Sequence, residues 1–321
     1  MQRETALIFP PELPGGRRAT LTNIWPNEDG RFWSYEIEQR TWDMPQIRYY
    51  ANPADVPPLP RLDAIVELLR RHPAGKNPVA AAAGYTMQFQ GLRTTQSGAT
   101  GQNLVTRVIP PVEIGPAAAI RAPLAPPGAA GGFMASLRTA RPDLAPKIAA
   151  RGPQNLAAAP AIAQDVQPPL FLFGYAWVKT PEYIGSYGDL NTDLAWKYLD
   201  ADLRPGSTFR MQLVPDLADN VFLYARVIRE GITFSRVGSI RSAIDVLYVV
   251  DFGASGLTDV NGDVIGYNRM YSYGTITYAP GVGPIASYER GLVQTGLLLD
   301  PGTYDQRIQL KGTAWVRSFP N

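Results

Sequence analysis

The chain has 321 residues and a formal net charge of +2, from 30 basic and 28 acidic residues that are interspersed along it. This balance argues against a dedicated nucleic-acid-binding surface, which normally needs a clustered basic face. With no cysteine and one histidine, the sequence excludes disulfides and thiolate–metal sites and argues against catalytic zinc and Cys–His catalysis. It contains no phosphate-binding loop, and we expect no cofactor.

Residues 1–16 are predicted to form an extended N-terminal arm, because prolines and glycines interrupt any regular structure there. The apolar run Ala6–Phe9 is too short for a signal peptide, and no stretch of the sequence is long and apolar enough to be a membrane span. We therefore expect synthesis in the cytoplasm. Such arms often lie on a neighbouring subunit, so Phe9, Pro10 and Pro11 are interface candidates.

Residues 17–109 are predicted to form a small β-rich domain with one helix. In Arg31–Glu38, apolar and polar residues alternate, which indicates a strand with one buried face. A helix is expected at Arg61–Arg71, where apolar residues follow helical spacing between two prolines. The predicted strands are Arg18–Trp25, Arg31–Glu38, Gln46–Ala51, Tyr85–Arg93 and Asn103–Ile109.

Residues 110–169 differ in composition from both flanks: seventeen of these sixty residues are Ala, twelve are Pro and eight are charged. Pro interrupts helix and sheet, and Ala buries little area, so the segment should not build a core of its own. We predict a long Ala/Pro-rich extended linker that lies on a neighbouring subunit or wraps its own domain. Phe133, its one aromatic residue, and the basic Arg138 and Arg141 are interface candidates.

Residues 170–321 are predicted to form the main domain, a jelly-roll-like antiparallel β-sandwich. A helix is expected at Asp189–Leu203 in a long connection, and Asn261-Gly262 predicts a tight hairpin turn. The predicted strands are Leu170–Val178, Thr208–Val214, Val221–Arg229, Ile232–Arg236, Ile244–Phe252, Arg269–Ala279, Gly291–Leu299 and Gln306–Phe319.

Catalytic groups are sparse in this sequence. The histidine, His72, follows the predicted helix, where its charged form suits a helix C-terminus better than catalysis. Two carboxylates could hydrolyse a glycoside, but a strand surface, a helix start and a turn explain the available pairs more simply. These pairs are Glu36 with Glu38, Asp189 with Asp193, and Asp216 with Asp219.

One short segment has the oxygen-rich character of a calcium loop. It contains Asp259, Asn261 and Asp263, which makes these residues weak calcium candidates. The spacing and the later Glu of an EF-hand are missing, and a hairpin turn explains the same residues.

Tyrosines gather at two places in the main domain. Tyr183 and Tyr187 lie near Trp177, and Tyr271 and Tyr273 belong to one predicted strand. Exposed Tyr and Trp can anchor a subunit interface or stack on a sugar. We take the four tyrosines as interface candidates and keep glycan contact open, although burial in the core is a further explanation.

The sequence favours a structural subunit of a large protein assembly. A virus or bacteriophage particle fits this pattern best, as a capsid, decoration, spike-base or tail-connecting protein, with the chain itself and other proteins of the particle as partners. This inference rests on analogy between architectures, not on a motif. The alternatives are a carbohydrate- or receptor-binding β-sandwich and, third, a glycoside-active enzyme.

Overall fold

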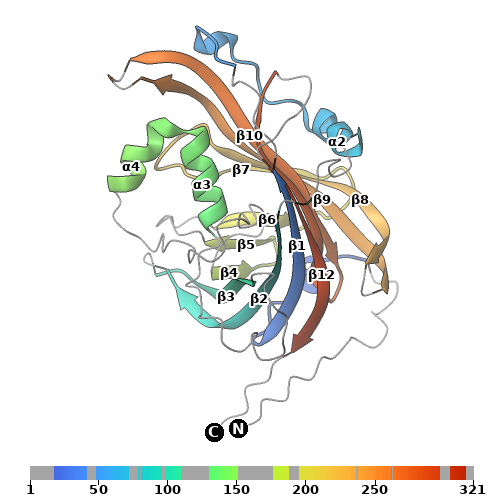
Figure 1. Cartoon of the computed structure of the whole chain (residues 1–321). Coiled ribbons are helices and arrows are strands. Elements are labelled where there is room, and N and C mark those ends of the chain that lie inside the picture. The colour runs from blue at the N-terminus through green and yellow to red at the C-terminus, as the bar shows by residue number, and fades with distance from the viewer. Residues whose placement is uncertain are drawn as a thin grey trace.

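The structure is a computed structural model in which a large, strongly curved β-sheet dominates (Figure 1). It describes residues 18–41, 48–71, 79, 81–95, 98–109, 130–150, 176–187, 195–235, 238–259, 261, 263–296 and 304–315. The predicted arm at 1–16, with Phe9, Pro10 and Pro11, lies outside the described residues, as do His72, Asp189 and Asp193.

The described strands lie in one sheet. Their bounds are β1 (Arg31–Thr41), β2 (Ala81–Thr94), β3 (Thr100–Ile109), β4 (Ala176–Lys179), β5 (Tyr183–Tyr187), β6 (Trp196–Asp200), β7 (Thr208–Gln212), β8 (Phe222–Ser235), β9 (Gly238–Thr258), β10 (Val264–Ala279), β11 (Gly283–Gln294) and β12 (Tyr304–Trp315). The helices are α1 (Leu21–Ile24), η1 (Pro53–Asp55), α2 (Leu62–Arg71), α3 (Ala130–Ala140), η3 (Pro142–Leu144) and α4 (Ala145–Ala150).

The strand order is β6-β5-β4-β3-β2-β1-β12-β11-β10-β9-β8-β7, with antiparallel pairing throughout. Neighbours in space are neighbours in sequence except where β1 pairs with β12. The sheet is nearly closed into a barrel, with β6 and β7 at its two ends (Figure 1). The mainly β prediction is confirmed, whereas the jelly-roll sandwich is not, because such a sandwich divides its strands between two sheets.

The two β-rich units predicted at 17–109 and 170–321 contribute to this same sheet. β3 pairs with β4 through Gln102 and Asn103, and β1 pairs with β12 along its whole length. Hydrogen-bonded ladders therefore join the N-terminal and C-terminal parts of the chain at two places.

The inner face of the sheet encloses the main hydrophobic core, which is rich in aromatic residues. Trp33, Tyr35 and Ile37 of β1 are buried on this face, as their alternation predicted. The Trp33 indole N–H donates to the carbonyl of Val282 at 2.6 Å, and the Tyr35 hydroxyl to that of Pro284 at 2.8 Å. These polar atoms thus have partners despite burial, as a stable core requires.

The outer face carries a second, smaller core beneath α2. Ile65 of α2 is fully buried, and it packs with Leu247, Val249, Tyr271 and Tyr273 of β9 and β10. The helix predicted at Arg61–Arg71 is thereby confirmed. Its apolar stripe covers the sheet, and its other side faces solvent.

Residues 130–150 form α3, η3 and α4, here called the inner helical segment, where the sequence predicted an extended linker. Figure 1 places it at one end of the curved sheet, beside β9 and β10. Phe133, Leu137, Leu144 and Ile148 are buried in the main core. The extended prediction is wrong for this part because apolar residues at helical spacing bury against the sheet, and both prolines lie in first turns, where a missing N–H costs nothing.

Arg141 secures this segment to β9. Its guanidinium makes two hydrogen bonds to Asp143, at 2.9 and 2.7 Å, and others to the side chain of Asn220 and the carbonyl of Phe252. The Ser255 hydroxyl of β9 donates to the carbonyl of Ala140 at 3.1 Å. These contacts attach the described part of the Ala/Pro-rich region to its own chain.

Several strand and helix predictions differ from the structure. Arg18–Trp25 contains the short helix α1, whose Asn23 side chain accepts from the Thr20 N–H at 2.9 Å. The helix predicted at Asp189–Leu203 is wrong in its described part, where β6 pairs with β5. Val221–Arg229 and Ile232–Arg236 merge into β8, while Tyr183–Tyr187 is a strand that the sequence did not predict.

Candidate functional site

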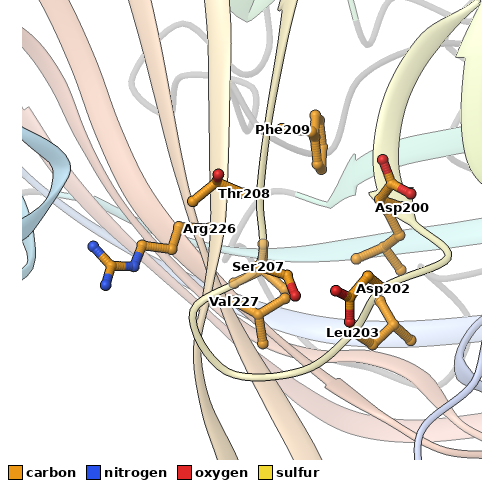
Figure 2. A pocket seen from close by; sticks show the side chains of 10 residues that line it. Asp200, Asp202, Leu203, Ser207, Thr208, Phe209, Arg226 and Val227 are labelled. Carbon is orange, nitrogen blue, oxygen red and sulfur yellow. The ribbon is translucent and has the colours of Figure 1, made fainter.

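A pocket lies where the two ends of the sheet meet, and we call it the seam pocket. It has a volume of about 180 Å³. Figure 2 shows its lining side chains, which come from β6, the β6–β7 connection, β7, β8 and β9. They are Leu199, Asp200, Asp202, Leu203, Ser207, Thr208, Phe209, Arg226, Val227 and Val246.

The backbone of the β6–β7 connection holds these side chains in place. Gly206 has a φ of 95°, which suits glycine, and its N–H donates to the Val227 carbonyl of β8 at 2.7 Å. The Val227 N–H in turn donates to the Ser207 carbonyl at 2.9 Å. The connection is therefore attached to β8, so both ends of the sheet contribute to one pocket.

The charged groups of the pocket are paired. Asp200 accepts from the Lys197 ammonium at 2.9 Å, and Asp202 forms two hydrogen bonds of 2.8 Å with the Arg204 guanidinium. Hydrogen bonds from Arg204 and then Ser207 hold the pKa of the Asp202 carboxyl well below its usual range. Figure 2 shows the Arg226 guanidinium directed away from both carboxylates, and it pairs with Asp63 of α2.

Most of the remaining lining is apolar or aromatic, and Ser207 and Thr208 add hydroxyl groups. Leu199, Leu203, Val227 and Val246 are buried and form part of the wall of the pocket. The partly exposed ring of Phe209 also lines it, with the Lys197 ammonium 5.5 Å from the ring centroid. The pocket thus combines an apolar wall with hydroxyl and carboxylate oxygens.

Two carboxylates, Asp200 and Asp202, line the seam pocket, and the glycosidase alternative requires one carboxyl of such a pair to act as an acid. A general acid needs a raised pKa, whereas the pKa of Asp202 is lowered. Burial raises the pKa of Asp251, a β9 carboxyl that lies 3.7 Å from Arg269 and does not line the seam pocket. The carboxyl whose pKa burial raises therefore lies apart from this pocket.

Two of the predicted carboxylate pairs lie among the described residues. Glu36 and Glu38 lie on β1 with half-buried side chains, and Asp216 and Asp219 are exposed in the β7–β8 connection. None of the four lines the seam pocket.

The calcium candidates lie in the turn between β9 and β10. The Asp259 carboxylate accepts from the backbone N–H groups of Asn261 and Asp263, at 2.8 and 3.0 Å. This is the bonding of an Asx-type turn, which accounts for the three residues without a metal. Within the described residues there is no cluster of three or more potential metal ligands.

The interface candidates lie in different environments. Phe133 and Arg141 are buried against the sheet, and Tyr271 and Tyr273 are buried beneath α2, so the chain itself covers all four. Tyr183 and Tyr187 of β5 are half-buried, and Arg138 of α3 is exposed.

A second feature, the ends of β9 and β10, extends beyond the rest of the sheet (Figure 1). The ladder between β8 and β9 ends at Asp251, and that between β10 and β11 ends at Met270. Residues 252–258 and 264–269 therefore form a two-stranded ribbon, here called the β9–β10 ribbon. Near its turn, Val264 and Ile265 are 51% and 59% exposed.

Sequence reasoning predicted the hairpin but missed the seam pocket. Most pocket residues lie between positions 199 and 209. Arg226 of β8 and Val246 of β9 are distant in sequence and reach the pocket through the fold of the sheet. Asp200, Asp202 and Ser207 carried a usable signal, a polar and glycine-containing connection, but the predicted helix at Asp189–Leu203 concealed it.

No helix in the described part of the chain has the length and apolar character needed to cross a membrane. The sequence matches no family model and no curated protein.

Two solved structures are similar over most of their length. One is a candidate exported protein with a YmcC-like fold from Bacteroides fragilis, with 9% identity and a TM-score of 0.34; the match covers 91% of this chain and 98% of that chain. The other is a candidate lipoprotein from Parabacteroides distasonis, with 7% identity and a TM-score of 0.31, covering 93% and 100%. At these TM-scores neither similarity identifies a family or a function.

Proposed function

We propose that this protein is a structural subunit of a larger assembly and that the β9–β10 ribbon contacts a second copy of the chain. The observation that carries the proposal is the exposed apolar end of a ribbon that extends beyond the sheet. A two-stranded hairpin is marginally stable in water without further packing, so the exposed tip of this ribbon gains stability from a partner.

The ribbon is well supported at its base. Tyr50 and Tyr267 form a bridge with two backbone hydrogen bonds of 2.9 Å, and the Ser255 hydroxyl binds the inner helical segment. At the tip, Asp259 fixes the turn through two backbone N–H groups. A ribbon fixed at both ends loses little conformational entropy when it binds, which favours an interface.

A second copy is a suitable partner because the strand edge of one ribbon can pair with the identical edge of another. Around Leu257 and Val264, the described strands pair with each other and with no third strand. Free strand edges pair readily with other strands, and two identical edges related by a twofold axis satisfy each other's N–H and C=O groups. Val264 and Ile265 would then be buried between the copies.

The experiment is light scattering after size-exclusion chromatography, over a range of protein concentrations. We expect a species larger than the 35.1 kDa monomer for the natural sequence. The double variant Val264→Ser, Ile265→Ser should shift it towards monomer. The matched control is Leu92→Ser, which removes a 70% exposed leucine at a different hairpin and should leave the oligomer unchanged.

A natural chain that stays monomeric at every concentration would overturn the proposal, as would equal effects of the ribbon and Leu92 variants. The prediction that the assembly is a virus or phage particle, and that the protein is made in the cytoplasm, remains a prediction from sequence. This experiment tests assembly and not its biological setting.

A further inference from the structure

We propose that the seam pocket binds one neutral, hydroxylated six-membered ring, such as a single sugar residue. The inference does not depend on the assembly proposal, because the pocket and the β9–β10 ribbon share no residue. Four properties of the pocket carry it: its size, its charge balance, its mixed lining and its place between the ends of the sheet.

The size limits the ligand to a single small ring. Pockets for drug-sized molecules occupy roughly 300–1,000 Å³, whereas this one measures about 180 Å³. A protein cavity of roughly 150 Å³ is large enough for benzene. The seam pocket therefore accommodates one six-membered ring, and further units of a chain would extend into solvent.

The charge balance favours a neutral ligand. An anion would have to compete with Asp200 and Asp202 for their cations, and the Arg226 guanidinium is directed away from both carboxylates towards Asp63 (Figure 2). A cation would have to compete with Lys197 and Arg204, which already pair with the two carboxylates. A ligand without charge avoids both costs.

The mixed lining suits a polyol ring. A carboxylate has about four acceptor positions, and Asp200 accepts from the Lys197 ammonium and the Ala201 N–H. Positions thus remain for ligand hydroxyl donors, and Thr208 adds a hydroxyl of its own. The C–H face of the ring can pack on Phe209 and on the leucine and valine side chains, as in other sites that combine apolar walls with a few polar groups.

The pocket lies at the junction between the two ends of the sheet. β6 and β7 are the end strands of the sheet, and no ladder joins them in the described structure. Between them, the Trp196 indole N–H donates to the Leu213 carbonyl at 2.8 Å, while the Lys197 N–H meets the sulfur of Met211, a weak acceptor. A ligand bound at this junction therefore does not compete with a ladder between β6 and β7 in the described structure.

The test uses the full chain and ligand-observed saturation-transfer NMR with D-glucose, D-galactose, N-acetyl-D-glucosamine and myo-inositol. Glucose 6-phosphate and glucosamine provide anionic and cationic rings of matched shape. We expect at least one neutral ring to bind, with a dissociation constant on the order of 1 mM, as a small ligand with few contacts allows. Its charged counterparts should bind at least tenfold more weakly.

Two variants test whether the ring binds in the seam pocket. Asp200→Ala removes the acceptor, and Phe209→Leu removes the aromatic face while retaining apolar volume; each should weaken binding at least tenfold. The matched control Asp219→Ala removes an exposed carboxylate that does not line the pocket and should leave affinity unchanged. Thermal unfolding of each variant verifies that it is folded.

Three results would overturn the inference: no binding of any neutral ring by the folded natural chain, tighter binding of a charged ring, or equal affinities of the pocket and control variants. The Val264→Ser, Ile265→Ser variant separates the two proposals. It should bind the sugar normally even where it no longer assembles.

Discussion

Two helical regions cover opposite faces of one sheet, and they differ in how they are held. α2 lies on the outer face with Ile65 fully buried and its charged residues in solvent. The inner helical segment, residues 130–150, inserts a series of apolar side chains into the main core and is secured by the buried Arg141. The apolar stripe of α2 was recognisable in the sequence, whereas the high Ala and Pro content around the inner helical segment concealed the helical spacing of its apolar residues.

The comparison predicts that the inner helical segment contributes more to stability. Phe133 contacts Trp196 and Phe252, with ring centroids 5.2 and 6.2 Å away. Phe133→Ala should lower the free energy of unfolding by about 3–5 kcal/mol, since it removes a buried ring and leaves a cavity. Arg138→Ala, on the exposed side of the same helix, should change it by less than about 0.5 kcal/mol. Urea unfolding gives both values, and equal effects would contradict the packing described.

The outer helix should show a smaller effect. Ile65→Ala removes a fully buried side chain, but a helix on the surface can move to close part of the cavity. We expect a loss of about 2 kcal/mol in urea unfolding, at the lower end for such a change. A loss greater than that of Phe133→Ala would mean that α2 contributes more to the free energy of unfolding than the inner helical segment does.

The buried Asp251 of β9 should make the stability of the folded chain depend on pH. Burial is the largest cause of its raised pKa, so the carboxyl is harder to ionise in the folded chain than in the unfolded chain. Its contribution to stability is present below the unfolded pKa of about 3.9 and declines as the pH rises through the raised pKa of the folded state. Other carboxyls respond as well, so the useful quantity is the difference between natural chain and Asp251→Asn.

Thermal unfolding of both proteins between about pH 3.5 and 7 measures this difference. The natural chain should lose stability relative to Asp251→Asn as the pH rises. A difference that stays constant or grows in favour of the natural chain would contradict the effect of burial on Asp251.

The smallest effect is expected for the ion pair between α2 and the sheet. Arg226 of β8 pairs with Asp63, whose side chain is 65% exposed. Solvent screens such a pair, so Asp63→Asn should cost about 0–1 kcal/mol, and less at high salt. Glu67→Gln, which removes a charge from the same helix, is the control. A large loss that persists in 1 M salt would mean that this contact, and not Ile65, holds α2 to the sheet.

The sequence correctly predicted the elements that have a simple local pattern. In β1, Trp33, Tyr35 and Ile37 repeat every second residue, and they are buried on one face. The apolar spacing in α2 correctly predicted a helix. The turn signal at Asn261 correctly predicted the hairpin of β9 and β10. Each of these patterns depends on residues only a few positions apart.

The sequence could not predict the candidate site. Asp200 and Phe209 belong to the two ends of the sheet, and they share a pocket with Arg226 and Val246 because the sheet curves back on itself. The half-buried Tyr183 lies in a strand whose identity depends on its pairing with β6. Such proximities depend on curvature and register, which no short pattern encodes.

The sequence by itself determined that the chain is mainly β, that one face of β1 is buried, and that α2 is a helix with an apolar stripe. The tertiary structure alone decided that both β-rich regions form one sheet, because β1 and β12 pair across most of the chain length. It also decided that the described part of the Ala/Pro-rich region is helical, because α3 and α4 gain their stability from contact with the sheet. A short helix is marginal in isolation, so the partner that buries it determines whether it forms.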